Sequence, residues 1–471
     1  MGDERLIDEE AYFAVREEQL VRRLERAGHL RRSIVRRGSE GAMVLAGAAR
    51  VAEPRPASGR ARVATPATHT TPATPTTPAT HTTPGTPTTP ATPTTPTTDT
   101  TPATTPARAD RPIVKPLPPD WFIDHGSNAE MRWESVPGLG YLVPNQRFFV
   151  RDHTSTPLID ARTWTLKLWG DGLRGERTPA RPVSFDYEQL RCLPSVEIPA
   201  AIECAGNGRS LFARQQGTGM EGTQWGLGAV GVASWRGVPL GEVLERAGIV
   251  SGAVDVMPWG LDDSYVTGGV DHGRVRRPLP VAKAFADAIL AYEMNGEPLP
   301  PDHGYPVRLV VPGWVGVASV KWVGEIQVSR APLDSFWNTT NYSLEGPAYP
   351  SPVPLTRQSV RSAFELAMNA RLRNEPQVLT GRSWSGLAPI KRVEISADGG
   401  ASWRPARLQP PNLAHAWVQW EYPWAPPGPG RYMLRARATD GDGRTQPQAV
   451  PFNSLGYMFS AVVKHPVTVA G

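Results

Sequence analysis

Apolar residues in the middle of the chain recur with the two periods that distinguish strands from helices. Between residues 112 and 335, short apolar runs alternate with turns rich in Gly and Pro, which favours strands with a few short helices. The pattern is α+β, because strands and helices do not alternate as they do in a parallel α/β sheet. The clearest segments are a strand at 164–168, a helix at 240–247, a strand at 290–294 that enters an Asn-Gly turn, and a buried strand at 307–311.

Residues 345–466 carry a second pattern, in which candidate strands follow one another at short intervals. Asp-Gly turn signals at 398–400 and 440–443 lie beside these strands. Five or more strands at this spacing predict an immunoglobulin-like β-sandwich. Tryptophans recur along the strands, and we expect them to fill the core or an interface. The candidate strands are residues 377–384, 391–397, 403–408, 416–424 and 431–438.

The N-terminal part of the chain has a different composition. Residues 3–27 have the spacing of a charged amphipathic helix, and paired arginines at 31–32 and 36–37 precede small apolar residues. This order is reminiscent of a twin-arginine export signal, which would place the protein in the periplasm or at the cell surface. The alternative is a solvated basic arm on a cytoplasmic protein. Residues 64–107 repeat Thr, Pro and Ala, which predicts an extended spacer without a core.

Composition narrows the class of protein further. The 471 residues include only two cysteines, so we expect no disulfide framework, and the formal charge of +5 suits an anionic ligand better than nucleic acid. No apolar run reaches the length of a membrane span. The predicted parts are a charged segment at 1–63, a disordered Thr/Pro-rich linker at 64–111, an α+β domain at 112–340 and a β-sandwich at 345–471.

Cys204 lies in the stretch that carries the most chemistry. It follows an apolar run at 196–202 and opens the turn Cys-Ala-Gly-Asn-Gly-Arg. Gly and Asn let the backbone take positive φ and approach a bound group closely, and Arg209 adds a positive charge. A thiolate in such surroundings is typical of sulfur presented to a soft metal or an electrophile. The alternative is a small buried hydrophobic side chain.

Basic side chains recur near the ends of other apolar runs in the 112–340 part. Arg forms forked hydrogen bonds with oxyanions and Lys supplies a point charge, so the set suits a ligand with phosphate or oxyanion groups. Taken singly, such a residue is more often a surface charge, or a histidine whose ring nitrogens are hydrogen-bonded within the protein. Together with Cys204 they predict an anionic cofactor site. The set is Arg151, His153, Arg209, His303, Arg308 and Lys321.

Several motifs resemble, in order, those of the sulfite oxidase family of molybdopterin-dependent oxidoreductases. Residues 204–209 resemble the family's Cys-Ala-Gly-Asn-Arg-Arg loop, and residues 222–240 are similar to the segment that follows it. Residues 291–304 look like a further signature, and residues 311–322 complete the match. The resemblance covers about residues 115–466. It implies the family's molybdopterin domain followed by its C-terminal dimerisation domain, and therefore a homodimer.

The resemblance also implies one molybdenum atom bound by a pyranopterin dithiolene (molybdopterin), with Cys204 as the metal's protein ligand. Arg209 matches an arginine beside the substrate oxyanion. Tyr342 matches the active-site tyrosine near the metal, and a capping aromatic on a loop is its alternative. Trp225 is expected to wall the pocket, and Arg151 belongs to both the catalytic and the cofactor sets. The positions that match pterin and phosphate contacts are Arg151, His153, Asp263, His303, Arg308, Ser319 and Lys321.

The implied activity is oxygen-atom transfer, with sulfite or a related sulfur compound as the small anionic substrate. No Cys-x-x-Cys-His haem motif occurs, so electrons are expected to pass to a separate carrier such as a cytochrome, or to oxygen. Two departures keep nitrate-reductase-like and sulfane-dehydrogenase-like activities open. Gly208 stands where the loop's first family arginine stands, and Lys464 takes the place of an arginine that reaches the substrate pocket. A non-catalytic surface binding protein is the alternative from another class.

Overall fold

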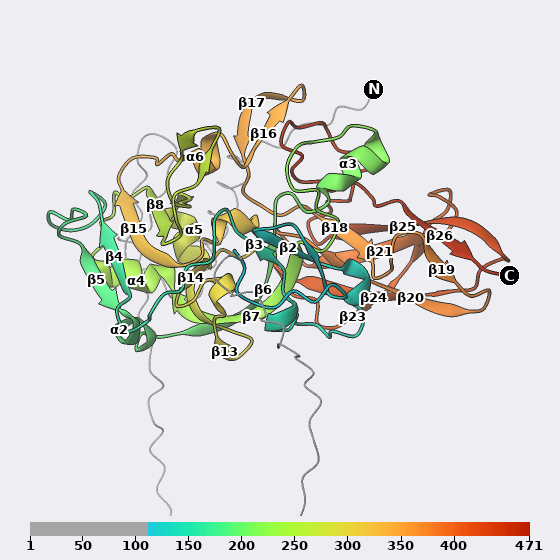
Figure 1. The fold of residues 1–471 in the computed structure, drawn as a ribbon, viewed down its shortest axis with the longest axis horizontal. Helices are drawn as coiled ribbons and strands as arrows, with labels where there is room; N and C mark the ends of the chain where they lie inside the picture. The colour runs from blue at the N-terminus through green and yellow to red at the C-terminus, as the bar shows by residue number, and fades with distance from the viewer. Residues whose placement is uncertain (1–111) are drawn as a thin grey trace, which may run out of the picture. The chain divides into compact units, whose positions relative to one another are not determined.

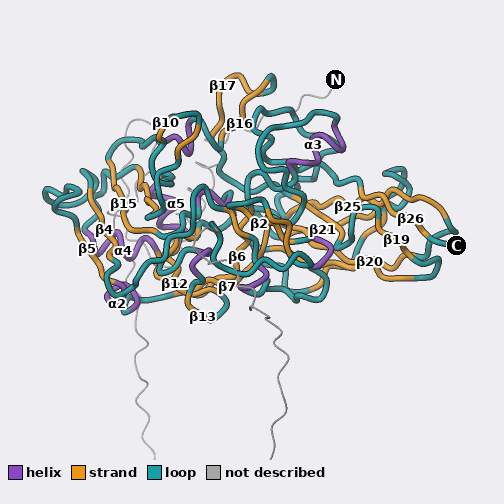
Figure 2. Tube along the Cα trace, in the orientation of Figure 1, coloured by secondary structure: helices purple, strands orange, loops and turns teal. Residues whose placement is uncertain are grey.

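The computed structural model describes residues 112–471, and strands and loops make up most of this part of the chain (Figure 2). The predicted helix at 3–27, the twin-arginine-like segment and the Thr/Pro-rich linker lie outside the described residues. Within the described range, no helix is long and apolar enough to cross a membrane. The α-helices are α2 (Tyr187–Arg191), α3 (Arg209–Gln216), α4 (Leu240–Ala247), α5 (Val281–Ala286) and α6 (Phe336–Thr339).

The first of two larger sheets formed before residue 330 has the strand order β11-β8-β15-β4-β5. Its pairings are antiparallel except for β15 with β4, which run parallel. Apolar residues on β4 and β15 pack with helix α4 in one buried cluster. The strands are β4 (Thr165–Trp169), β5 (Val183–Asp186), β8 (Asp255–Gly260), β11 (Leu279–Pro280) and β15 (Val323–Ser329).

The second sheet has the order β13-β12-β7-β6, with β14 also paired to β12. Successive residues of a strand point to opposite faces. On β12, Ala291 therefore packs into the cluster that holds Phe148 and Trp235, whereas Leu290 packs into the cluster of helix α4. Burial on both faces explains the continuous apolar run in this segment. The strands are β6 (Val196–Glu203), β7 (Val230–Pro239), β12 (Ile289–Met294), β13 (Glu297–Pro298) and β14 (Arg308–Val310).

Three small sheets surround these two. One joins β1, β2 and β3, and the others are the hairpins β9–β10 and β16–β17. Strand β3 ends at Arg151, and β16 begins directly after Tyr342, so two of the predicted site residues lie at strand ends. The strands are β1 (Phe122–Asp124), β2 (Asn128–Met131), β3 (Val150–Arg151), β9 (Val266–Thr267), β10 (Val270–Asp271), β16 (Ser343–Gly346) and β17 (Tyr349–Pro354).

The C-terminal strands, orange to red in Figure 1, form two sheets with the orders β18-β20-β24-β23 and β19-β26-β25-β21-β22. Side chains of both sheets meet in one core, where Trp420 of the first sheet and Val393 of the second are both buried. The strands are β18 (Arg361–Phe364), β19 (Ala370–Leu372), β20 (Gln377–Trp384), β21 (Ile390–Ser396), β22 (Arg404–Pro405), β23 (Arg407–Gln409), β24 (Trp417–Trp424), β25 (Gly430–Asp440) and β26 (His465–Val469).

Most predicted elements are confirmed within one or two residues. Helix α4 has the predicted bounds and ends at Gly248, whose φ of 85° suits a glycine cap. The predicted strand at 403–408 was wrong, because the chain crosses there between sheets. Residues 404–405 pair with β21 and residues 407–409 pair with β24, so one segment supplies two short strands. Strand β7, buried along nearly its whole length, was not predicted.

Candidate active site

Cys204 lies at the first turn after the long strand β6. Its backbone N–H donates to the Ala229 carbonyl at 2.9 Å, which ties the turn to the residue before β7. Gly208 has a φ of 85° and caps helix α3, so the glycine supplies the left-handed conformation that the turn needs. The thiol is buried, and it lines a cavity instead of facing only hydrocarbon. The turn therefore presents sulfur to a bounded space, as the sequence predicts.

A buried carboxylate, Glu203, anchors this turn to the C-terminal strands. It accepts hydrogen bonds from Asn207 Nδ2 at 3.0 Å and from Trp384 Nε1 at 2.9 Å. It also forms an ion pair with Arg361 Nη1 at 2.7 Å, and the same nitrogen donates to the Asn207 carbonyl at 2.9 Å. All these groups are buried, so the turn is held by a polar network that sequence reasoning missed.

The same network explains the glycine at 208. A Cβ at this position would lie 2.7 Å from Arg361 Nη2 and 3.2 Å from the Cβ of Phe459. The positive φ would strain a side chain there in addition. The departure from the family's loop is thus linked to Arg361, whose guanidinium occupies the space beside the turn.

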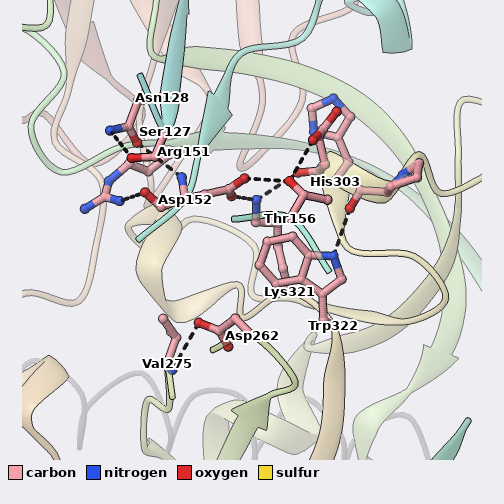
Figure 3. Close-up of polar contacts among 12 residues, drawn as sticks. Ser127, Asn128, Arg151, Asp152, Thr156, Asp262, Val275, His303, Lys321 and Trp322 are labelled. Atoms are coloured by element: carbon pink, nitrogen blue, oxygen red, sulfur yellow. Dashed lines mark hydrogen bonds and ion pairs between the residues drawn. The ribbon is translucent and has the colours of Figure 1, made fainter. Parts of the chain in front are cut away.

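One cavity collects most of the predicted site residues. Its walls come from β3, the turn after β6, the 3-10 helix η5 (Pro301–His303), β14 and the segment before β15. Figure 3 shows His303, Lys321 and Arg151 grouped with Asp152 and Thr156. The predicted residues that line the cavity are Arg151, His153, Cys204, His303, Arg308, Ser319, Lys321 and Tyr342.

His303 and Arg308 form one wall, and both are almost fully buried. Arg308 donates from Nη1 to the His303 carbonyl and from Nη2 to the Ser319 carbonyl, each at 3.0 Å. His303 Nε2 is buried without a hydrogen-bond partner. Burial lowers the pKa of Arg308 to about 9 and lowers the pKa of His303 well below its usual value. This wall would therefore favour an anionic group, whose charge and acceptors offset the cost of burying these side chains.

Lys321 also lines the cavity and contacts two aspartates. Its ammonium pairs with Asp152 and donates to the Asp302 carbonyl at 2.8 Å. The Asp302 carboxylate already accepts from Thr156 Oγ1 at 2.7 Å and from the backbone N–H groups of residues 114 and 115, each at 2.8 Å. Burial lowers the pKa of Lys321 well below its usual value, and the positive Arg151 nearby adds to this. An incoming anionic group would offset that cost.

Tyr342 closes the cavity near Cys204. Its hydroxyl accepts from Arg151 Nη2 at 3.2 Å and lies 3.0 Å from His153 Nε2. The His153 ring packs edge-on against Trp337, with centroids 4.3 Å apart. Burial raises the pKa of Tyr342, so the phenol stays protonated at neutral pH, although Arg151 acts in the opposite direction. The site therefore offers a neutral proton donor beside a cation.

Three sequence expectations differ from what the structure places at the cavity. Arg209 is buried, but it donates to the carbonyls of Leu455 and Thr223 at 3.0 and 2.8 Å and does not line the cavity. Asp263 is exposed, and its buried neighbour Asp262 lines the wall instead. Trp225 is buried but does not line the cavity. Lys464, the second departure from the family pattern, donates to the Gln215 carbonyl and also lies off the cavity wall.

The described residues do not include a cluster of three or more His, Cys, Asp or Glu that could hold a metal ion by itself. A metal in this cavity would therefore need ligands from a bound organic group besides the Cys204 sulfur. The unpartnered His303 Nε2 and the surrounding cations fit a group that carries phosphate or oxyanion oxygens. The residues present thus fit a metal cofactor with an anionic tail.

Comparison with known families agrees with this chemistry. Residues 153–337 match the family described as the oxidoreductase molybdopterin binding domain, and residues 358–469 match the Mo-co oxidoreductase dimerisation domain. The chain is 33% identical to a sulfite oxidase of Gallus gallus over 330 residues, which are 66% of this chain and 69% of that protein. It is 32% identical to the mitochondrial sulfite oxidase of Homo sapiens, over 73% of this chain and 64% of that protein.

Other relatives carry different activities. The chain is 30% identical to a nitrate reductase [NAD(P)H] of Hordeum vulgare, over 71% of this chain and 40% of that protein. The crystal structure of the sulfane dehydrogenase SoxCD from Paracoccus pantotrophus aligns with a TM-score of 0.62 at 26% identity, over 74% of this chain and 84% of that chain. This chain thus spans about two thirds of the sulfite oxidases and less than half of the nitrate reductase.

Proposed function

The chain belongs to the sulfite oxidase family of molybdopterin oxidoreductases, and from this premise we propose that it oxidises sulfite or a related small sulfur compound and passes the electrons to a separate carrier such as a cytochrome. It is an oxidoreductase that uses the molybdenum cofactor. The single observation that carries the proposal is one cavity lined by Cys204, by buried cations and by His303, whose Nε2 has no hydrogen-bond partner.

The residues that we propose to hold the cofactor are those that line the cavity. Cys204 would ligate molybdenum, and the other predicted wall residues would hold the pterin and its phosphate. When bound, the cofactor would supply oxygen-atom transfer coupled to a two-electron change at the metal. Arg308 and His303 would bind the phosphate. The buried His303 Nε2 would gain a partner, and the buried Arg308 guanidinium, which already donates to backbone carbonyls, would supply positive charge. Lys321 would exchange part of its pairing with Asp152 for the same anion.

Arg151 and Tyr342, which also line the cavity, would be the residues that contact the substrate. Arg151 would attract the anionic substrate and hold its oxygens, while the neutral Tyr342 phenol donates a hydrogen bond to an oxyanion. The aromatic rings of Trp337 and Tyr342 help to keep bulk water away from this part of the cavity. Arg209 would act through its positive charge on Tyr342, because it lies off the cavity and its Nε and Nη1 donate to backbone carbonyls.

Nitrate reduction and sulfane dehydrogenation remain the alternatives for the substrate. The first rests on the identity to nitrate reductases and the second on the structural likeness to SoxCD. Because such enzymes share the metal site, only the residues that contact the substrate distinguish the three activities. The non-catalytic alternative has no support among these relatives, which are enzymes.

The domain boundaries and assembly are part of the same proposal. We assign residues 112–340 to the cofactor domain and residues 345–471 to an immunoglobulin-like dimerisation domain. The two C-terminal sheets with their shared core, and the dimerisation family matched there, support the assignment. Light scattering that gives a monomer mass at micromolar concentration would contradict the homodimer.

The test of the activity compares the two cysteines of the chain. Purified protein is expected to contain molybdenum and pterin, and to oxidise sulfite with an artificial one-electron acceptor. Cys204→Ser should abolish turnover and leave the fold intact, whereas Cys192→Ser, at an exposed cysteine, should leave turnover unchanged. A panel of sulfite, thiosulfate and nitrate distinguishes the alternatives. Full turnover by Cys204→Ser, or protein purified without molybdenum, would contradict the proposal.

A further inference from the structure

A loop of the C-terminal part, residues 453–458, brings a second phenol to the back of Tyr342. The Tyr457 ring is buried and stacks on the Tyr342 ring, with centroids 5.2 Å apart and planes only 4° from parallel. Tyr457 does not line the cavity. Tyr457 therefore contacts Tyr342, which lines the cavity, but does not line the cavity itself.

The Tyr457 hydroxyl also reaches the backbone of Tyr342 through one shared acceptor. It donates to Asn341 Oδ1 at 2.6 Å, and the same oxygen accepts the Tyr342 backbone N–H at 3.1 Å. Tyr342 has a φ of 59°, in the left-handed region that a bulky residue seldom adopts. Conformations of this kind persist only where the surroundings hold them in place. Asn341 and Tyr457 contribute to this, together with the Leu355 N–H that donates to the Tyr342 carbonyl at 2.9 Å.

The loop that carries Tyr457 is itself rigidly held. Asn453 closes it by accepting the Tyr457 N–H at Oδ1, at 2.8 Å, and by donating from Nδ2 to the Tyr457 carbonyl at 3.0 Å. The Met458 N–H donates to the carbonyl of Ala205, the residue after Cys204, at 2.9 Å. The Arg209 guanidinium lies 5.2 Å from the Tyr457 ring centroid. Tyr457 is thus fixed against the turn that presents the sulfur.

We propose that Tyr457 is a positioning residue, which holds the Tyr342 phenol between Arg151 and His153. This inference rests on the proposed function, since it gives Tyr342 the task of contacting the substrate. The stacked ring prevents Tyr342 from rotating away from the cavity. The hydrogen bond to Asn341 keeps the Tyr342 backbone in its left-handed conformation, and so fixes the distances of 3.2 and 3.0 Å to its two partners.

The test uses holoenzyme with Tyr457→Phe, which keeps the ring and loses the hydroxyl, and Tyr457→Leu, which loses both. Tyr432→Phe is the matched control, because its hydroxyl donates to the Gly428 carbonyl at 2.7 Å in the C-terminal sandwich. We expect kcat to fall about fivefold in Tyr457→Phe and about thirtyfold in Tyr457→Leu, with KM changed less than kcat and molybdenum content unchanged. The control should match the parent protein. Crystal structures should show the Tyr342 hydroxyl displaced in Tyr457→Leu.

A double-mutant cycle with Tyr342→Phe separates positioning from general destabilisation. If Tyr457 acts through the Tyr342 phenol, adding Tyr457→Leu to Tyr342→Phe should lower kcat by less than about twofold. An equal loss in both backgrounds, or an unmoved Tyr342 hydroxyl in Tyr457→Leu, would overturn the inference while the role of Tyr342 stands. Full turnover by Tyr342→Phe alone would instead overturn the proposed role of Tyr342 and the inference with it.

Discussion

Replacing Arg361 by methionine should destabilise the fold through the carboxylate that it leaves behind. The side chains of Arg361 and Glu203 are only 5% and 6% exposed, and they pair at 2.7 Å. The change removes that ion pair and the 2.9 Å hydrogen bond to the Asn207 carbonyl. Removing one partner of a buried pair costs about 3–5 kcal/mol. Because Asn207 and Trp384 still donate to Glu203, we expect the lower end, about 3 kcal/mol.

Urea unfolding followed by tryptophan fluorescence measures this loss. Arg361→Met combined with Glu203→Gln removes the charge as well, and should recover part of the stability lost by Arg361→Met alone. Arg162→Met is the control, because its ion pair with Asp160 lies on the surface, and it should leave the free energy of unfolding unchanged. A loss below about 1 kcal/mol in Arg361→Met, or a double variant that is less stable than the single one, would refute the reasoning.

Three further predictions concern the loop and the cavity. Gly208→Ala should lower the free energy of unfolding by about 2–4 kcal/mol, because of the positive φ and the contact with Arg361. Gly217→Ala, with φ of 77° and open space around it, should lose only the cost of the positive φ, and equal losses in the two variants would contradict the contact with Arg361. His303→Ala should lower the pterin and molybdenum content of purified protein about tenfold, which elemental analysis measures, and full content would refute its role. Burial raises the pKa of Asp262 from 3.8 to about 6, so between these values the folded chain keeps a proton that the unfolded chain has released, and stability should fall as pH rises. Asp262→Asn should remove up to about 3 kcal/mol of this pH dependence, and a pH profile of urea unfolding that Asp262→Asn leaves unchanged would contradict the role of Asp262.

The local sequence pattern was sufficient to predict most of the helices and strands and part of the candidate site. Helix α4 and strand β20 have the predicted bounds, because their periodicity and flanking turns are encoded within a few residues. Eight predicted residues line one cavity, because each followed an apolar run or belonged to a family motif. The segment at 403–408 failed because pairing with two different sheets is a non-local property.

Residues that act from a distance along the chain were not predictable in this way. Arg361 and Tyr457 lie more than a hundred positions after the groups they contact, Glu203 and Tyr342, and neither stands in a recognisable motif. Asp263 was preferred to Asp262 because adjacent positions in a turn differ only in the direction of the side chain. Arg209 is diverted to backbone carbonyls that the sequence does not locate.

The amino-acid sequence alone determined most of the elements, the family and the cysteine that lines the cavity, because periodicity, turn chemistry and motif spacing are local properties. Only the tertiary structure decided which cations share a cavity and which are bound elsewhere. It also showed that the Cys204 turn and Tyr342 are held by the C-terminal part of the chain. The physical reason is that burial and pairing set the charge and position of a side chain, and both depend on segments that come together only on folding.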